Sequence, residues 1–168
     1  MKLFWMDRNR RRAVDRLDEV VAVPPSAPRP TSKAPDDNAL AVIGPAAKSD
    51  AEAFREAGWS FVPVQPDAAD ADRRAVYVGE SGKLYIDGRR LTVRFAPSMS
   101  PQRISKMLGE HGLIVERRLG FAPNSYIVSL AGESGSDIVE LANEMSQEPD
   151  VDYATPSFLE AIGARSGR

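Results

Sequence analysis

The sequence contains no cysteine and a single histidine, His111. The lack of cysteine excludes disulfide bonds, thiolate zinc sites and a cysteine nucleophile. No run of about 18 apolar residues occurs, so we expect no membrane-spanning helix. A net charge of −2 provides no overall field that would attract nucleic acid or a membrane surface. We therefore expect no cofactor, no bound metal and no nucleic-acid partner.

We also expect no secretion signal at the N-terminus. The first six residues are largely apolar, but Asp7 and Arg10 to Arg12 follow where an apolar segment should continue. A cytoplasmic location is therefore favoured. The length of 168 residues suits one or two small domains, and the 13 prolines lower the fraction expected to be ordered.

The first 38 residues divide into two expected segments. Within residues 1–23, residues 6 to 23 show apolar positions at helical spacing, which predicts an amphipathic helix. This helix is either a lone surface segment, the favoured interpretation, or a docking helix for a partner. Residues 24–38 form a proline-rich linker, since proline disrupts both helices and sheet ladders. The apolar helix positions are Val14, Leu17, Val20 and Val21.

Residues 39–88 predict a strand, a helix, a strand and a hairpin. The apolar run 40–43 suggests the first strand, and Ser49 begins a helix that Gly58 ends. Residues 59–64 alternate as the second strand. Residues 74–86 then read as a hairpin whose turn lies at 79–82, and Asp87 with Gly88 marks a second turn.

Residues 89–156 show the clearest pattern: strand, helix, strand, strand, helix, strand. Ser100 caps the first helix, with Pro101 at its first position, and Ser136 caps the second. This order predicts an α+β fold, a ferredoxin-like split βαβ with a four-stranded antiparallel sheet and both helices on one face. Residues 157–168 remain as an extended tail. The uncovered sheet face should dock a partner through Thr92, Arg94, Ile127 and Ser129.

Three candidate catalytic features have simpler structural explanations, so we expect no catalytic residues and no enzyme. Residues 79–83 resemble a phosphate loop but continue with Leu84, where a metal-binding Ser or Thr is needed. Residues 132–135 lack the final glycine of a nucleophile elbow. His111 stands at a helix end, where the helix dipole favours it without any catalytic role.

The C-terminal half resembles the N-terminal prodomain of subtilisin-like serine proteases, most closely the fervidolysin-like type. The resemblance covers residues 89–163, and its most specific part is the ending after the second helix. It is carried by Leu91-Thr92-Val93-Arg94-Phe95-Ala96-Pro97, Gly112-Leu113-Ile114-Val115-Glu116-Arg117, Asn124-Ser125-Tyr126-Ile127-Val128 and Glu148-Pro149-Asp150-Val151-Asp152-Tyr153-Ala154-Thr155-Pro156.

The resemblance implies a propeptide-type inhibitor or folding chaperone that places its sheet on the protease and its tail in the substrate cleft. Thr155 replaces the family's usual Glu, which weakens one acidic contact. No protease motifs follow, so the protein acts in trans or is part of a longer precursor. The cleft-binding tail would comprise Thr155, Pro156, Ser157, Phe158, Leu159, Glu160, Ala161, Ile162 and Gly163.

Two other functions remain open from the sequence. The module could be a ferredoxin-like adaptor in a larger complex, docked through the N-terminal helix. It could also bind a small ligand or nucleic acid on the open sheet face, through Arg94 and Arg117. Deleting residues 1–38 would distinguish these hypotheses, because loss of partner binding with the C-terminal tail intact would support the adaptor.

Overall fold

The computed structural model describes residues 1–7, 10–26, 36–64, 73–131 and 137–162. The chain forms two compact units that share its long strands. Unit 1 comprises residues 1–2, 14–87 and 159–168, and unit 2 comprises residues 3–13 and 88–158. The hydrogen-bonded strand order is β1-β2-β4-β5-β7-β6, with β3 paired to β2 and β8 paired to β5.

Strands dominate the structure. They are β1 (Lys2–Asp7), β2 (Arg10–Val23), β3 (Ser60–Pro63), β4 (Arg74–Gly79), β5 (Leu84–Phe95), β6 (Leu113–Arg118), β7 (Ser125–Leu130) and β8 (Val151–Glu160). The helices are α1 (Asp36–Ile43), the 3₁₀ turn η1 (Pro45–Ala47), α2 (Lys48–Glu56), α3 (Pro101–Glu110) and α4 (Ile138–Gln147).

The expected ferredoxin-like fold with a four-stranded sheet is wrong. The structure has 47% strand and 27% helix, with eight strands in one open sheet. The six elements expected from residue 89 onward occur in the expected order, but β5 and β8 extend beyond them. Gly88 lies inside β5 rather than in a turn, because the backbone of Ser157 in β8 approaches it closely. Close pairing of two strands has therefore overridden a strong local turn signal.

The prediction of an amphipathic helix at residues 6 to 23 is also wrong, because residues 10–23 form β2. The spacing of its valines fits a helix, but valine is β-branched and packs well on a pleated sheet. In β2, Val20 to Val23 pair with β3, and Val14 to Arg16 pair with β4. The strand expected at residues 40–43 is wrong as well, since these residues belong to helix α1. The expected linker lies mostly outside the described residues.

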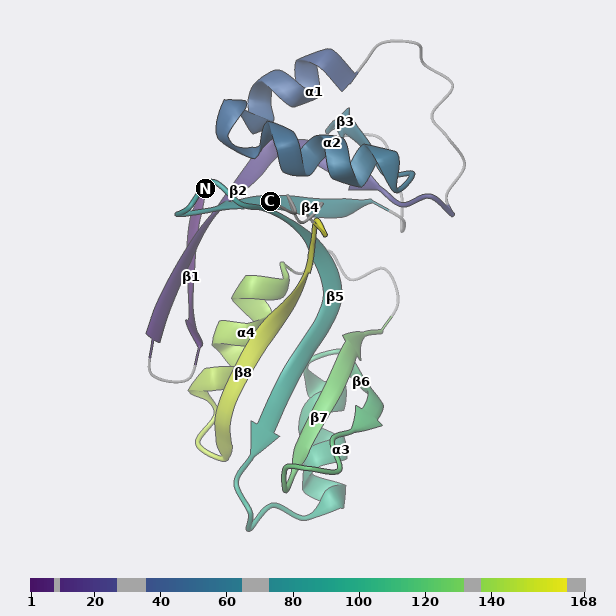
Figure 1. Cartoon of the computed structure of the whole chain (residues 1–168). Helices are drawn as coiled ribbons and strands as arrows, with labels where there is room; N and C mark the ends of the chain where they lie inside the picture. Colours follow the sequence, from purple (N-terminus) through teal and green to yellow (C-terminus); the bar gives the residue numbers. More distant parts are fainter. Residues whose placement is uncertain (8–9, 27–35, 65–72, 132–136, 163–168) are drawn as a thin grey trace. The chain divides into compact units, whose positions relative to one another are not determined.

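Unit 1 buries one apolar cluster under its helices. In Figure 1, α1 and α2 lie on one side of β2, β3 and β4. Phe61 of β3 is fully buried, and its ring packs edge-to-face on Phe54 of α2 at 6.3 Å. The expected hairpin is confirmed, since β4 pairs with β5 and the turn at 79–83 connects them. The cluster contains Val20, Ala22, Ala39, Ile43, Ala47, Ala51, Phe54, Phe61, Val76, Leu84 and Ile86.

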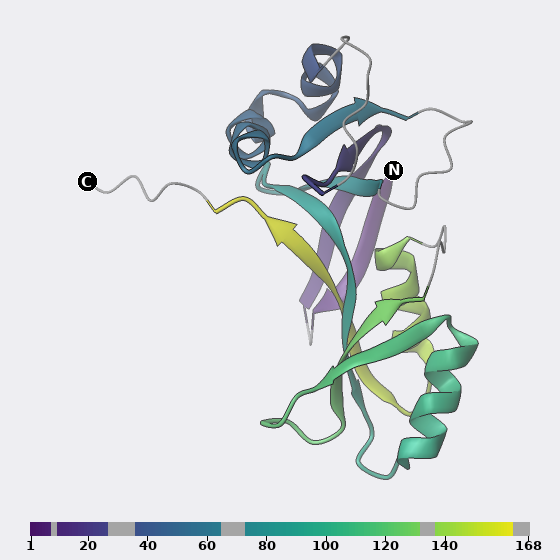
Figure 2. The same cartoon turned by 90° about the vertical axis from the view of Figure 1, so that its right-hand side faces the viewer.

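Unit 2 covers one face of its strands with two helices. Figures 1 and 2 show α3 and α4 on the same side of β5, β7 and β8. Leu91, Val93 and Phe95 of β5 are fully buried there, as the alternation of the sequence predicted. The expected α3 cap is confirmed, because Ser100 Oγ accepts from the Arg103 amide at 3.3 Å and Pro101 follows.

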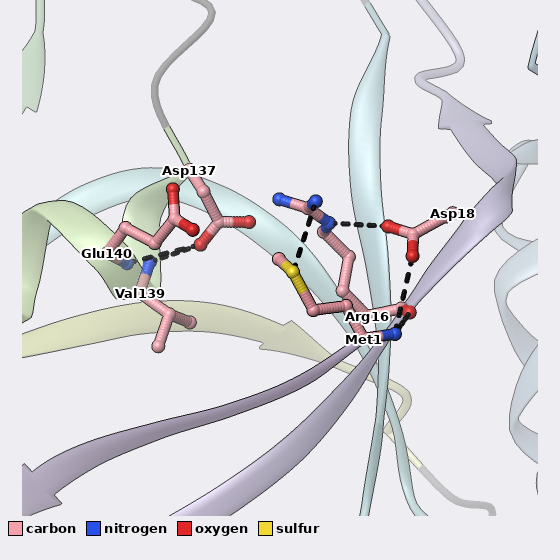
Figure 3. A network of polar contacts seen from close by, with 6 residues as sticks. All are labelled: Met1, Arg16, Asp18, Asp137, Val139 and Glu140. Carbon is pink, nitrogen blue, oxygen red and sulfur yellow. Dashed lines mark hydrogen bonds and ion pairs between the residues drawn. The ribbon is translucent and has the colours of Figure 1, made fainter.

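Helix α4 is capped by Asp137. Its Oδ1 accepts from the amides of Val139 at 2.8 Å and Glu140 at 3.2 Å (Figure 3). Both bonds satisfy N–H groups that have no partner within the helix. The expected cap, Ser136, lies outside the described residues.

Replacing Asp137 by alanine should lower the free energy of unfolding by about 1 kcal/mol, because two helix N–H groups lose their acceptor. Urea denaturation followed by circular dichroism measures the change. Asp137→Asn is the matched control, since an amide oxygen can cap as well. Equal stability of Asp137→Ala and the parent protein would contradict the cap.

Candidate functional site

The uncovered face of the unit 2 strands is the best candidate for a binding surface. Its side chains follow from the strand registers, because directly opposed residues of antiparallel strands share a face. Thr92 of β5 opposes Ile127 of β7, and Arg90 opposes Ser129. On β6, Ile114 opposes Ser129 and Arg117 opposes Ile127, so both lie on the same face. We call this surface the open face: Arg90, Thr92, Arg94, Ile114, Arg117, Ile127 and Ser129.

The four docking residues expected from the sequence all lie on the open face. Thr92, Arg94, Ile127 and Ser129 are each half-buried. Thr92 and Ile127 are directly opposed, whereas Arg94 stands opposite Ser125, two residues further along β5. The structure therefore brings them onto one surface. Sequence reasoning missed Ile114, which is 53% exposed beside them.

Two ion pairs bring together most of the charge on the open face. Arg90 Nε lies 2.8 Å from Glu116, and Arg94 Nε lies 3.6 Å from Asp152. All four side chains are about a third or more exposed, so each pair contributes little to folding stability. The pairs do leave Arg94 with a nearby carboxylate, which argues against a phosphate site there. A nucleic-acid surface through Arg94 and Arg117 is correspondingly less favoured.

Most of the expected cleft-binding tail is part of the sheet. Thr155 to Glu160 form the second half of β8, which pairs with β5, and Pro156 is buried. Ala161 packs against the apolar cluster of unit 1. Ile162 is 94% exposed, and Gly163 lies outside the described residues. A segment engaged in a ladder cannot enter a cleft as a free strand unless that ladder breaks.

Residues from three of the four segments that carry the family resemblance meet at one end of unit 2. The Phe95 amide donates to Asn124 O at 2.9 Å, and the Ala96 amide donates to Asp150 O at 2.8 Å. The Asn124 side chain also donates to Ala96 O at 3.0 Å, and Arg103 donates to Asp150 Oδ2 at 2.8 Å. These motif residues join the ends of three strands and a helix, which is a structural role.

His111 occupies a structural position. It is the C-cap residue of α3, as the sequence predicted. Its two ring nitrogens lie 3.9 Å from Glu144 and 3.4 Å from Glu148, both at the end of α4. The arrangement fastens the end of α3 to α4. Among the described residues there is no group of three or more acidic or histidine side chains that could hold a metal ion.

The pKa shifts in unit 1 hold two surface groups in their charged forms. A hydrogen bond from Arg16 Nε, at 2.8 Å, lowers the pKa of Asp18, with a smaller contribution from the Met1 ammonium at 3.3 Å (Figure 3). A hydrogen bond to Glu160, at 2.6 Å, raises the pKa of Lys83. Both shifts oppose the ones that a general base or a nucleophilic lysine needs.

Comparisons of the chain with protein-family models, curated proteins and solved structures find no match. The prodomain resemblance therefore stays a prediction. Within the described part of the chain, no helix is long and apolar enough to cross a membrane.

Proposed function

We propose that the protein binds a subtilisin-like serine protease through the open face and acts as a propeptide-like inhibitor or folding partner. One observation carries the proposal. On the covered face, Leu91, Val93, Phe95 and Val128 are fully buried, while the open face presents half-buried Thr92 and Ile127 beside exposed Ile114. A sheet face of this mixed composition suits burial against a partner protein.

The charges of the open face favour a protein partner. Burying an unpaired charge in an interface costs several kcal/mol, whereas a paired charge costs less. Arg90 and Arg94 already have Glu116 and Asp152 as neighbours. A partner surface can therefore cover the apolar centre of the open face without having to neutralise these arginines.

The segment proposed to enter the protease cleft is shorter than the one that the sequence predicted. Inserting Thr155 to Glu160 into a protease cleft would cost the β5–β8 ladder. Ala161 follows β8 but packs against the apolar cluster of unit 1, so exposed Ile162 is the first residue that could enter a cleft without loss of either contact. In this proposal, docking rests on the open face, and the chain after β8 contributes any contact with the cleft.

Replacing Ile127 by aspartate should weaken binding to the protease by about 2 kcal/mol, or about thirtyfold in Kd, because a charge replaces an apolar side chain at the centre of the interface. Titration of a subtilisin-type protease with the full chain, read as loss of peptidase activity and as heat of binding, measures the effect. Circular dichroism of the variant confirms that it is folded.

Val42→Asp is the matched control, because Val42 is an exposed apolar residue of α1 in unit 1. It should bind and inhibit as the parent protein does. The proposal is wrong if the parent protein neither binds nor inhibits any subtilisin-type protease offered to it. Binding that Ile127→Asp leaves unchanged would place the docking surface elsewhere.

A further inference from the structure

Strand β6 is an exposed edge of the sheet. It stands last in the strand order, and β7 is its one described strand partner. Five of its six residues are exposed, Leu113 being the exception. Native proteins usually shield such an edge, because its free N–H and C=O groups can pair with another chain. β6 carries a bulge and charged side chains, which limit unspecific pairing, but its backbone edge can still accept a further strand.

The backbone of β6 directs specific polar groups outward. The Ala131 amide donates to Gly112 O, and the Leu119 amide donates to Ser125 O, both at 2.8 Å. Hydrogen-bonded and non-hydrogen-bonded pairs alternate along an antiparallel ladder, so the register assigns the direction of each backbone group. The groups that point away from β7 belong to Leu113, Val115 and Arg118.

The side chains of β6 combine apolar surface with unpaired positive charge. Ile114 is 53% exposed and Val115 is 46% exposed. Glu116, the extra residue of a bulge in the β6–β7 register, pairs with Arg90. Arg117 and Arg118 are exposed, and neither forms an ion pair with the residues that the structure describes. The strip that an incoming chain meets is therefore apolar at its start and basic at its end.

The turn after β6 adds an aromatic side chain. Phe121 is 87% exposed between β6 and β7. Exposed aromatic and arginine residues are the types that dominate the energetics of protein interfaces. Phe121 lies three residues beyond Arg118, so one bound segment could contact both.

We propose that β6 binds an extended acidic segment of a partner protein, which adds to the sheet as a further strand. Carboxylates of the segment pair with Arg117 and Arg118, and its apolar residues cover Ile114 and Val115. A second copy of β6 is a poorer occupant, since it brings two further arginines to a strip that is already basic. The proposal does not depend on a protease partner, because it concerns the backbone edge of β6; Ile114 and Arg117 belong to both this edge and the open face.

Two synthetic ten-residue peptides with blocked ends test the proposal on the full chain. One carries adjacent glutamates flanked by valine and threonine, because Arg117 and Arg118 are consecutive strand residues that face opposite sides of the sheet, and the other has lysine in place of each glutamate. Binding is read from fluorescence anisotropy of labelled peptide and from amide hydrogen exchange by NMR. The acidic peptide should slow exchange of the Val115 and Arg118 amides about tenfold or more, because they gain hydrogen-bond acceptors. The Ile114 and Arg117 amides already face β7 and should change little.

Reversing both charges, Arg117→Glu with Arg118→Glu, should weaken binding of the acidic peptide about tenfold or more. Lys106→Glu is the matched control, because Lys106 is an exposed cation of α3. It should leave the affinity unchanged. Val115→Pro is a second variant: it removes an outward N–H that β7 does not use, and it should also abolish binding.

Three results would overturn the proposal. Equal affinity for the basic peptide would remove the role of the arginines. Slower exchange of amides outside β6 in the presence of the acidic peptide would show that the peptide binds elsewhere. Protection of β6 that grows with protein concentration in the absence of peptide would identify a second copy as the occupant. These results leave the Ile127→Asp experiment unaffected, so failure here and failure of the protease proposal remain distinguishable.

Discussion

Alanine at position 88 is expected to lower the free energy of unfolding by about 2 to 3 kcal/mol, because the added methyl group has no space. A Cβ atom on Gly88 would lie 2.5 Å from the backbone oxygen of Ser157 and 3.3 Å from its carbonyl carbon. A backbone atom cannot rotate away as a side chain can, so β5 and β8 would have to separate. Urea denaturation followed by Trp5 fluorescence measures the effect, since the Trp5 ring packs on Phe158 in unit 2.

Gly109→Ala is the matched control for Gly88→Ala. Gly109 lies in α3, and a Cβ there would meet no atom within 4 Å. Alanine favours a helix over glycine by about 0.8 to 1 kcal/mol, so this variant should be more stable than the parent protein. If Gly88→Ala proved as stable as the parent protein, the close approach of β5 and β8 would be contradicted.

Replacing Phe61 by alanine is expected to cost about 3 to 5 kcal/mol, the range for removing a fully buried aromatic ring. The ring is fully buried in the apolar cluster of unit 1, against Phe54. Its removal leaves a cavity between the strands and α2 that the neighbouring rings can fill only in part. Trp59 packs edge-to-face on Phe54 at 6.2 Å, so its fluorescence reports unfolding of unit 1.

Val64→Ala is the control for Phe61→Ala, because Val64 follows β3 directly and is 44% exposed. Its effect should stay within about 0.5 kcal/mol. A Phe61→Ala protein that unfolds at the same urea concentration as the Val64→Ala protein would show that Phe61 is not part of a packed core.

The two destabilising changes lie in different units, and only Gly88 lies on a strand of the open face. Gly88 lies at the point where β5 enters unit 2, and β5 contributes Arg90, Thr92 and Arg94 to the open face. Phe61 lies in unit 1, away from any residue of the open face in the sequence. Gly88→Ala should therefore also weaken binding to a partner, whereas loss of binding in Phe61→Ala would follow only from unfolding.

Features governed by near neighbours in the chain were predictable. Ser100 followed by Pro101 is a helix start because the hydroxyl accepts from an amide three residues later. The glycines of residues 79–83 allow a tight hairpin turn, and Gly82 adopts a φ of 80°. The alternation from Leu91 to Phe95 separated a buried face from a wet face correctly. The same alternation placed Thr92 on the candidate surface.

Features governed by distant partners were not predictable. The valines of β2 fit helical spacing equally well until β3 and β4 provide partners for them. The helix-forming composition of α3 and α4 contained no information on the length of the strands beside them. Ile114 and Phe121 looked like ordinary strand and turn residues, because exposure depends on which elements cover them.

The sequence by itself determined the start of α3, the hairpin turn and the alternating faces of single strands, since each depends on residues a few positions apart. The tertiary structure decided how far β5 and β8 extend, that β2 is a strand, and that Thr155 to Glu160 belong to the sheet. The physical reason is the same in each case. A strand is stabilised by hydrogen bonds to another strand, and that partner can lie anywhere in the chain.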